Sequence, residues 1–282
     1  MKKLLRKIAC RSTRVMMKSD LLWSMAQRFP NHDFFHRQRY PVIHKRARSQ
    51  CADLLSERTV IAGPFAGLRY AQEAAVGSSL WPKLLGTYES ELRPCFEAIK
   101  QKANYRQVVD VGFAEGFYLV GLGRQFPAAQ LVGFDTEDEA KQLCQANATA
   151  NGIDQHRLKL FGGFDADAFR NELQSDSLVV VDCEGFENQV VESLSADELS
   201  KADWLIEAHD HLVAGTTDRL KLAFQPTHEI EEVVTDSDLV TKQSLLPASV
   251  RNRCSAYVQE ALVSEGRMAE QKWIFATRRK AA

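Results

Sequence analysis

Short apolar runs alternate with amphipathic stretches along the chain from residue 107 onward. The apolar runs are rich in Val, Ile, Leu and Phe, as expected for strands that are buried on both faces. Between them, Phe117–Phe126 and Glu137–Ala150 have the pattern of helices, and the second is followed by Asn151-Gly152, a natural helix terminus. This alternation indicates an α/β fold with a doubly wound, mainly parallel sheet of about seven strands. The strands are expected at residues 107–111, 130–134, 157–161, 177–181, 204–206, 228–234 and 273–277.

The first hundred residues do not show this alternation. Residues 20–60 are polar and mainly helical in pattern, and residues 61–94 are interrupted by Gly and Pro, which favours loops. A short helix is expected through Phe96–Lys100. We therefore predict a basic, mainly helical N-terminal segment with a lid at residues 1–100, followed by an α/β domain at residues 101–282.

The turn after the first predicted strand, in Gln107–Tyr118 (QVVDVGFAEGFY), is the strongest candidate for a ligand site. A Gly-rich turn between a strand and a helix forms ligand crevices in α/β sheets, although an ordinary tight turn has the same pattern. The spacing does not match a dinucleotide turn, and a P-loop would need Gly-Lys-Ser/Thr. Asp110 and Glu115 would repel a phosphate and attract a cationic ligand. S-adenosylmethionine, with its sulfonium and ammonium groups, has that charge.

Asp135 directly follows the second predicted strand, twenty-five positions after Asp110. An acid at this position is well placed to accept hydrogen bonds from ribose hydroxyls. Together with Asp110–Gly116, it resembles the first two motifs of the class I S-adenosylmethionine-dependent methyltransferases. The resemblance implies a Rossmann-like sheet whose last strand is antiparallel.

Two acidic segments follow the fourth and fifth predicted strands, Asp182-Cys-Glu-Gly-Phe-Glu187 and Glu207-Ala-His-Asp-His211. With Leu85–Glu89 upstream and Glu265–Arg267 downstream, they resemble the FkbM-type methyltransferases over residues 60–278. Ala114 departs from the wider class, in which many members have glycine. The resemblance implies S-adenosylmethionine as cofactor and O-methylation of a hydroxyl on a glycan, a natural product or another small molecule.

Methyl transfer to a hydroxyl needs a group that accepts the proton. The candidates are Asp182, Glu184, Glu207 and His209, with His211 on the same face as His209 if the strand continues. Glu187 is expected only to favour the helix dipole. A metal held by Asp182, Glu184 and a His would act as a Lewis acid on the acceptor oxygen. Because no ligand spacing is diagnostic, this stays a minority alternative, and no metal is included in the prediction.

The residues expected to bind the cofactor belong to the first turn, the strand ends and the lid. Tyr88 and Glu89 lie in the lid, where core or surface roles fit equally well, and Asp165 fits a helix cap equally well. The full set is Asp110, Gly112, Ala114, Glu115, Gly116, Tyr118, Asp135, Gly163, Asp165, Asp182, Tyr88 and Glu89.

Charge is distributed unevenly along the chain. Residues 1–48 contain thirteen Lys and Arg residues and two Asp, a net charge of +11, whereas the rest carries −12. The segment is expected to pack on the protein or to make peripheral contact with an anionic acceptor, partner or membrane surface. No specific nucleic-acid partner is predicted. The N-terminus lacks a secretory signal, and the six scattered cysteines indicate reduced thiols and a cytoplasmic protein.

Three functions remain open at this point. The first is a methyltransferase. The second is a non-catalytic adenosyl- or nucleotide-binding module that engages an anionic partner through the basic N-terminus. A dehydrogenase is disfavoured by the glycine spacing and by the charge of the turn. The sequence identifies neither the acceptor nor the oligomeric state.

Overall fold

The computed structural model describes residues 18–19, 21–22, 25, 45–47, 49–235, 238–267 and 270–279. The predicted amphipathic N-terminal helix and most of the basic segment lie outside these residues. Contacts divide the chain into one unit of residues 1–57 and 238–264, and a second of residues 58–237 and 265–282. This division differs from the predicted boundary at residue 100, because residues 58–100 belong to the unit that contains the sheet and residues 238–264 belong to the other unit.

The second unit is built on a seven-stranded sheet with the strand order β3-β2-β1-β4-β5-β7-β6. Strands β1 to β5 pair in parallel, and β7 pairs antiparallel with both β5 and β6. The predicted Rossmann-like sheet with an antiparallel last strand is therefore confirmed. The strands are β1 Gln107–Val111, β2 Gln130–Phe134, β3 Leu158–Phe161, β4 Ser177–Val181, β5 Ala202–Ala208, β6 His228–Val234 and β7 Lys272–Arg278.

Four of the strands have the predicted bounds, and β5 differs most, because it is two residues longer at each end. Asp203 interrupts its apolar run, yet this side chain is buried and paired with Arg278 and Lys102. A polar residue whose partners come from elsewhere in the chain is invisible to a local hydrophobic pattern. The extension also brings Glu207 into the strand.

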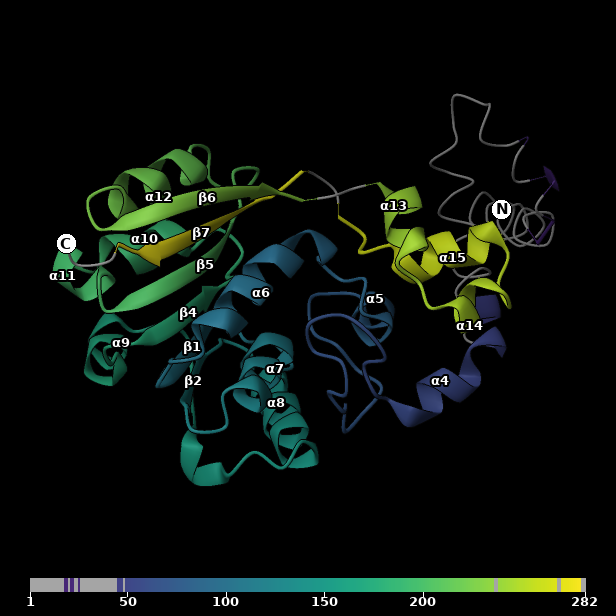
Figure 1. The fold of residues 1–282 in the computed structure, drawn as a ribbon, viewed down its shortest axis with the longest axis horizontal. Helices are drawn as coiled ribbons and strands as arrows, with labels where there is room; N and C mark the ends of the chain where they lie inside the picture. The colour runs from purple at the N-terminus through teal and green to yellow at the C-terminus, as the bar shows by residue number, and fades with distance from the viewer. Residues whose placement is uncertain are drawn as a thin grey trace, which may run out of the picture. The chain divides into compact units, whose positions relative to one another are not determined.

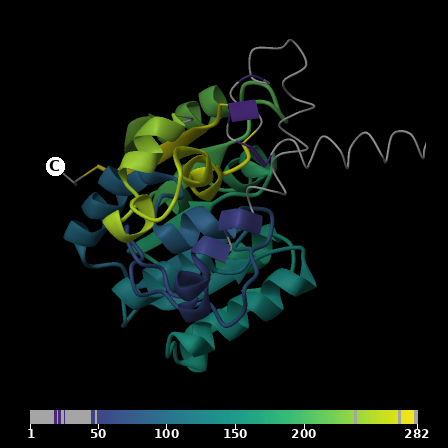
Figure 2. The ribbon, with the colours of Figure 1, turned by 90° about the vertical axis from the view of Figure 1, so that its right-hand side faces the viewer.

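Helices cover both faces of the sheet, with α8 and α12 on opposite sides in both views (Figures 1 and 2). Phe169, Val190 and Phe224, from α9, α10 and α12, share one core cluster with β1, β2, β4 and β5. Helix α7 packs on the other face of β1 and β2. The helices of this unit are α5 Leu80–Leu85, η1 Ser90–Leu92, α6 Arg93–Lys102, α7 Phe117–Gln125, α8 Asp138–Ala150, η2 Gln155–Arg157, α9 Ala166–Glu172, α10 Glu187–Glu192, α11 Ala196–Leu199 and α12 Thr216–Phe224.

The described part of the other unit is helical, with α4 Ala52–Glu57, α13 Leu239–Ser244, α14 Ala248–Arg251 and α15 Ala256–Val263. The Sγ atoms of Cys51 and Cys254 lie 3.6 Å apart, and Asp53 pairs with Arg253 2.5 Å away. Among the described residues, no helix combines the length and the apolar composition that crossing a bilayer requires.

The strand order changes direction between β1 and β4, which lie side by side while their connections lead to opposite edges of the sheet. In open α/β sheets, ligands bind beyond the carboxyl ends of the strands at such a point. Backbone hydrogen bonds join the carboxyl ends of β1, β2 and β4. The Gly112 N–H donates to the Phe134 carbonyl at 2.8 Å, and the Asp182 N–H donates to the Val111 carbonyl at 2.9 Å. A ligand site is therefore expected at the loops that follow β1 and β4.

Candidate functional site

The loop between β1 and α7 requires a glycine at its first position. Gly112 has φ +87°, and a Cβ atom there would lie 1.8 Å from the carbonyl oxygen of Asp182. Any side chain would therefore push apart the loops that follow β1 and β4. The bare backbone of the first loop directly contacts the start of the acidic segment.

Ala114 adopts the left-handed conformation that glycine prefers, with φ +48°. This conformation costs an alanine about 1–2 kcal/mol. The Ala114 N–H donates to Oδ2 of Asp135 at 2.8 Å, which helps to hold the turn. The chain thus keeps a glycine-type turn geometry despite its departure from the sequence pattern of the methyltransferases.

Asp135 lies half-buried beside this turn. Its Oδ2 accepts the Ala114 N–H, and its Oδ1 accepts the Glu137 N–H at 2.9 Å. A carboxylate oxygen can accept two hydrogen bonds, so each oxygen keeps one lone pair for a ligand hydroxyl. The predicted ribose contact is compatible with this geometry.

Asp110 lies at the end of β1 and is 1 % exposed. Within the part of the chain that the structure describes, neither of its carboxylate oxygens has a hydrogen-bond partner. Burial raises the pKa of Asp110 well above its ordinary value, and the negative charges of Asp182 and Asp135 raise it further. A buried carboxyl group without a partner is costly, so a cationic or hydrogen-bonding ligand would stabilise it.

Glu115 has a different role from the predicted one. Its fully buried carboxylate accepts from Lys83 at 2.6 Å, from the Tyr70 hydroxyl at 3.2 Å and from the Val76 N–H at 3.0 Å. Because Lys83 neutralises this charge, Glu115 does not supply the negative charge that was expected to attract a cationic ligand. It anchors residues 70–83 to the first loop.

Two further candidates, Asp165 and Tyr118, have structural partners. Asp165 caps α9 by accepting the Ala168 N–H at 2.8 Å, as its alternative interpretation predicted. Tyr118 stacks on Phe96 with the ring centroids 5.8 Å apart. These contacts neither require nor exclude the predicted contacts of Asp165 and Tyr118 with a cofactor, and the same holds for the backbone of Gly116 and Gly163.

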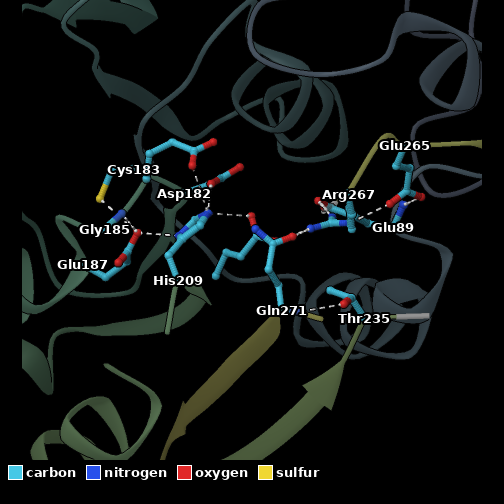
Figure 3. A network of polar contacts seen from close by, with 12 residues as sticks. Glu89, Asp182, Cys183, Gly185, Glu187, His209, Thr235, Glu265, Arg267 and Gln271 are labelled. Carbon is cyan, nitrogen blue, oxygen red and sulfur yellow. Dashed lines mark hydrogen bonds and ion pairs between the residues drawn. The ribbon is translucent and has the colours of Figure 1, made fainter. Parts of the chain in front are cut away.

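Beside the loop between β1 and α7, four carboxylates of the two acidic segments surround the buried His209, as Figure 3 shows in part. Nε2 of His209 lies 3.5 Å from Glu184 Oε2, 3.6 Å from Glu207 Oε2 and 3.7 Å from Asp182 Oδ1. Nδ1 lies 2.7 Å from Glu187 Oε1. We call these five residues the carboxylate–histidine cluster. All four predicted catalytic residues therefore belong to one site.

Glu187 was predicted only to favour the helix dipole, yet it determines how His209 is oriented. A carboxylate can only accept, so the imidazole donates Nδ1–H to Glu187, and Nε2 faces the other three acids. The same Oε1 accepts the Gly185 N–H at 2.8 Å. The signal that the sequence offered was a third acid in a segment that already held Asp182 and Glu184.

His211 lies next to the cluster but outside it. Strand β5 ends at Ala208, before either histidine, and the ring centroids of His209 and His211 are 5.7 Å apart. The two rings are therefore neighbours even though the strand does not continue. His211 is exposed, whereas His209 is fully buried.

The pKa values in the cluster follow its charge. Burial lowers the pKa of His209, but the hydrogen bond to Glu187 and the charges of Asp182 and Glu184 outweigh it and raise the pKa. Burial also raises the pKa of Glu207, and Asp182 adds to that rise. The neighbouring carboxylates raise the pKa of both groups, against the effect of burial for His209 and in addition to it for Glu207.

Arg267 ties the cluster to the lid (Figure 3). It contacts Glu89, lies 2.5 Å from Glu207 Oε1, and lies 2.8 Å from Glu265 Oε2. The Glu89 N–H in turn donates to Glu265 Oε1 at 3.0 Å. Residues 85–89 and 265–267 were linked only by resemblance, and no pattern in the sequence indicates that Arg267 pairs with Glu89, Glu207 and Glu265.

Glu89 and its neighbour Tyr88 respond to the same charges. Burial raises the pKa of Glu89 to about 8, although Arg267 opposes the shift. Burial also raises the pKa of Tyr88, with Glu89 and Asp182 adding to the rise. The charge of Asp182 thus contributes to both shifts, and the contact of Tyr88 and Glu89 with a cofactor stays a prediction. Glu89 and Glu184 have positive φ angles of +44° and +51°, and such strain concentrates at functional sites.

Comparisons with known proteins give structural likenesses only. No protein-family model and no curated protein matches this chain. A precorrin-6y C5,15-methyltransferase from Geobacter metallireducens is similar at 10 % identity, with 65 % of this chain and 88 % of that chain covered and a TM-score of 0.43. An O-methyltransferase from Bacillus cereus in complex with SAH is similar at 11 % identity, with 64 % of this chain and 78 % of that chain covered and a TM-score of 0.44. The METTL16 methyltransferase domain is similar at 12 % identity, with 84 % of this chain and 79 % of that chain covered and a TM-score of 0.47.

Likenesses this distant leave the function of the chain to be argued from its own residues. The strongest evidence is the meeting of two features at one sheet edge, namely the glycine-type loop with Asp135 and the carboxylate–histidine cluster.

The buried pair of Lys83 and Glu115 allows a direct test of the structural role of Glu115. Lys83→Met should lower the free energy of unfolding by about 3–5 kcal/mol, because it leaves a buried carboxylate without its cation. The double variant Lys83→Met/Glu115→Gln should recover most of that loss. Urea unfolding of both variants measures the effect, and a single variant as stable as the wild type would return Glu115 to the candidates for ligand binding.

Proposed function

We propose that this chain is an S-adenosylmethionine-dependent methyltransferase of the FkbM type, which methylates a hydroxyl oxygen on a glycan or small-molecule acceptor. The observation that carries the proposal is the contact between the two loops. Gly112 lies against the Asp182 carbonyl, so a ligand on the first loop borders the carboxylate–histidine cluster. An enzyme of this class needs a cofactor site and a proton acceptor in that relation.

The residues of the first loop suit this cofactor in shape and in charge. The glycine-type turn at residues 112–116 presents backbone to a ligand, and Asp135 keeps an acceptor lone pair on each oxygen for two ribose hydroxyls. Buried Asp110 favours a ligand with positive charge or hydrogen-bond donors. The glycine spacing of the turn, with Ala114 at the middle position, does not match a dinucleotide turn.

The chemistry requires little of the protein beyond alignment and proton transfer. Bound S-adenosylmethionine supplies the methyl group: the acceptor oxygen bonds to it, its bond to sulfur breaks with the electron pair left on sulfur, and the protein accepts the hydroxyl proton. Asp182 and Glu184 are the acids of the cluster that solvent reaches, with 24 % and 73 % of their side chains exposed. They are therefore the residues that orient the hydroxyl and take its proton.

Exposed apolar side chains next to Glu184 favour an acceptor with an apolar surface near its hydroxyl. Phe186 is 44 % exposed and Leu212 is 52 % exposed. A Cβ atom on Gly185 would lie 3.3 Å from Leu212 Cβ, so Leu212 borders the same turn. A natural product or the apolar face of a sugar ring would cover these side chains.

Calorimetry tests the cofactor assignment. S-adenosylmethionine should bind more tightly than a nicotinamide dinucleotide, and Asp135→Ala should weaken its binding by about 1–3 kcal/mol, because the ligand's hydroxyls lose an acceptor. Asp154→Ala is the matched control: like Asp135, Asp154 accepts the backbone N–H of the residue two positions later, at 2.9 Å, but it precedes β3 instead of following a strand. Its loss should leave the affinity unchanged. Tighter binding of the dinucleotide, or equal affinities in the two variants, would refute the assignment.

Turnover separates the enzyme from a non-catalytic binding module. With an acceptor found by screening hydroxyl compounds for S-adenosylhomocysteine release, Glu184→Gln and Asp182→Asn should slow release about a hundred- to ten-thousand-fold, the usual cost of losing a general base. Both variants should unfold at wild-type urea concentrations. Cofactor binding with no release in any acceptor mixture would favour the binding module. Normal turnover in both variants would move the base to Glu207 or His209.

A further inference from the structure

The carboxylate–histidine cluster brings together donor atoms that could hold one metal ion in the space between them. One ligand atom each from Asp182, Glu207 and His209 lie within 4.8 Å of one another. The distances from His209 Nε2 to the two carboxylates, 3.7 and 3.6 Å, are too long for hydrogen bonds. Two ligands each about 2.1 Å from one ion would lie about 3.0–3.4 Å apart at angles between octahedral and tetrahedral. Small side-chain movements would bring the observed distances of 3.6 and 3.7 Å into this range.

His209 points an unpartnered nitrogen into this space. The residue is fully buried, and within the described part of the chain Nε2 has no hydrogen-bond partner. Its other ring nitrogen donates to Glu187 at 2.7 Å. Metal-binding histidines characteristically donate their second N–H to a carboxylate in this way, which fixes the tautomer and aims the lone pair at the ion.

Glu207 divides its two oxygens between a cation of the protein and the space. Oε1 lies 2.5 Å from Arg267 Nη1, whereas Oε2 faces His209 Nε2. The ion pairs of Arg267 join it to Glu89, Glu207 and Glu265 (Figure 3). Arg267 therefore does not pair with the Glu207 oxygen that faces Nε2, and that oxygen is available to a cation from solution.

We propose that Asp182, Glu207 and His209 bind a divalent cation, with Glu184 as a further carboxylate on its open side. Two carboxylates and an imidazole suit Mn²⁺, which accepts both oxygen and nitrogen ligands, while Mg²⁺ and Zn²⁺ are its competitors. Binding of the ion does not depend on the function proposed above.

The role of the ion in methylation rests on the proposed function. A divalent cation lowers the pKa of an oxygen that binds it. The acceptor class is then a hydroxyl that coordinates the ion, and Glu184, beside the ion and exposed, accepts its proton. The proposed enzyme would thereby need no strong base.

The test measures binding of Mn²⁺ alone, without cofactor, by electron paramagnetic resonance of the free ion. The folded wild-type protein should bind one Mn²⁺ at this site. Asp182→Asn and Glu207→Gln should each weaken binding at least about a hundred-fold, and Glu187→Gln, which only positions His209, about ten- to a hundred-fold. Circular dichroism of each variant shows that it remains folded.

Asp210→Asn is the matched control. Asp210 follows His209 directly, but its carboxylate bonds to Thr217 instead of facing the cluster. This variant should bind Mn²⁺ as the wild type does. Failure of the folded wild type to bind Mn²⁺ overturns the proposal, as does undiminished binding in folded Asp182→Asn and Glu207→Gln.

Failure of the metal site is distinguishable from failure of the proposed function. Calorimetry with S-adenosylmethionine in the presence of a chelator reports the cofactor site by itself. A protein that binds the cofactor but no Mn²⁺ keeps the proposed function and loses the metal. A protein that binds Mn²⁺ but not the cofactor keeps the metal and loses the methyltransferase assignment.

Discussion

The buried hydrogen bond between His209 and Glu187 is the interaction on which the candidate site depends. It joins the end of β5 to the first turn of α10, and both residues are fully buried. Because Glu187 accepts from Nδ1, the opposite nitrogen is directed at Asp182, Glu184 and Glu207. Without it the imidazole could turn, and the three acids would lose the group around which they are arranged.

Excess negative charge is the second property of this sheet edge. Parallel strands deliver Asp110, Asp182 and Glu207 to the same edge, and the raised pKa values of Asp110 and Glu207 show the cost of burying them together. Arg267 offsets part of that cost for Glu207. The remaining charge suits positively charged partners, which is the property that a sulfonium cofactor and a divalent cation share.

The sequence was sufficient for the sheet because its strands are buried runs of apolar residues with clear ends. β1, β2, β4 and β6 have the predicted bounds, whereas β5 was predicted too short, because the charge of Asp203 is satisfied by distant residues that no local pattern includes. Long-range pairing explains the failures at the site in the same way.

Glu115 looked like a free acid in a ligand loop, and only the fold shows that Lys83, thirty-two positions away, neutralises it. Glu187 looked like a helix-dipole acid, and only the fold brings His209 to it. By contrast, Asp182, Glu184, Glu207 and His209 were predicted together, because the carboxyl ends of neighbouring parallel strands must meet at one edge. A sequence therefore predicts which side chains the sheet topology brings to one edge, but not which of their charges are already paired with distant residues.

The central claim is that one edge of the sheet holds both the cofactor and the group that receives the methyl. A crystal structure with S-adenosylhomocysteine tests it most directly. The account predicts the ribose hydroxyls on Asp135, the amino-acid part over residues 112–116, and the sulfur facing Asp182 and Glu184. A nucleoside bound elsewhere, or a sulfur directed away from the carboxylate–histidine cluster, would contradict it.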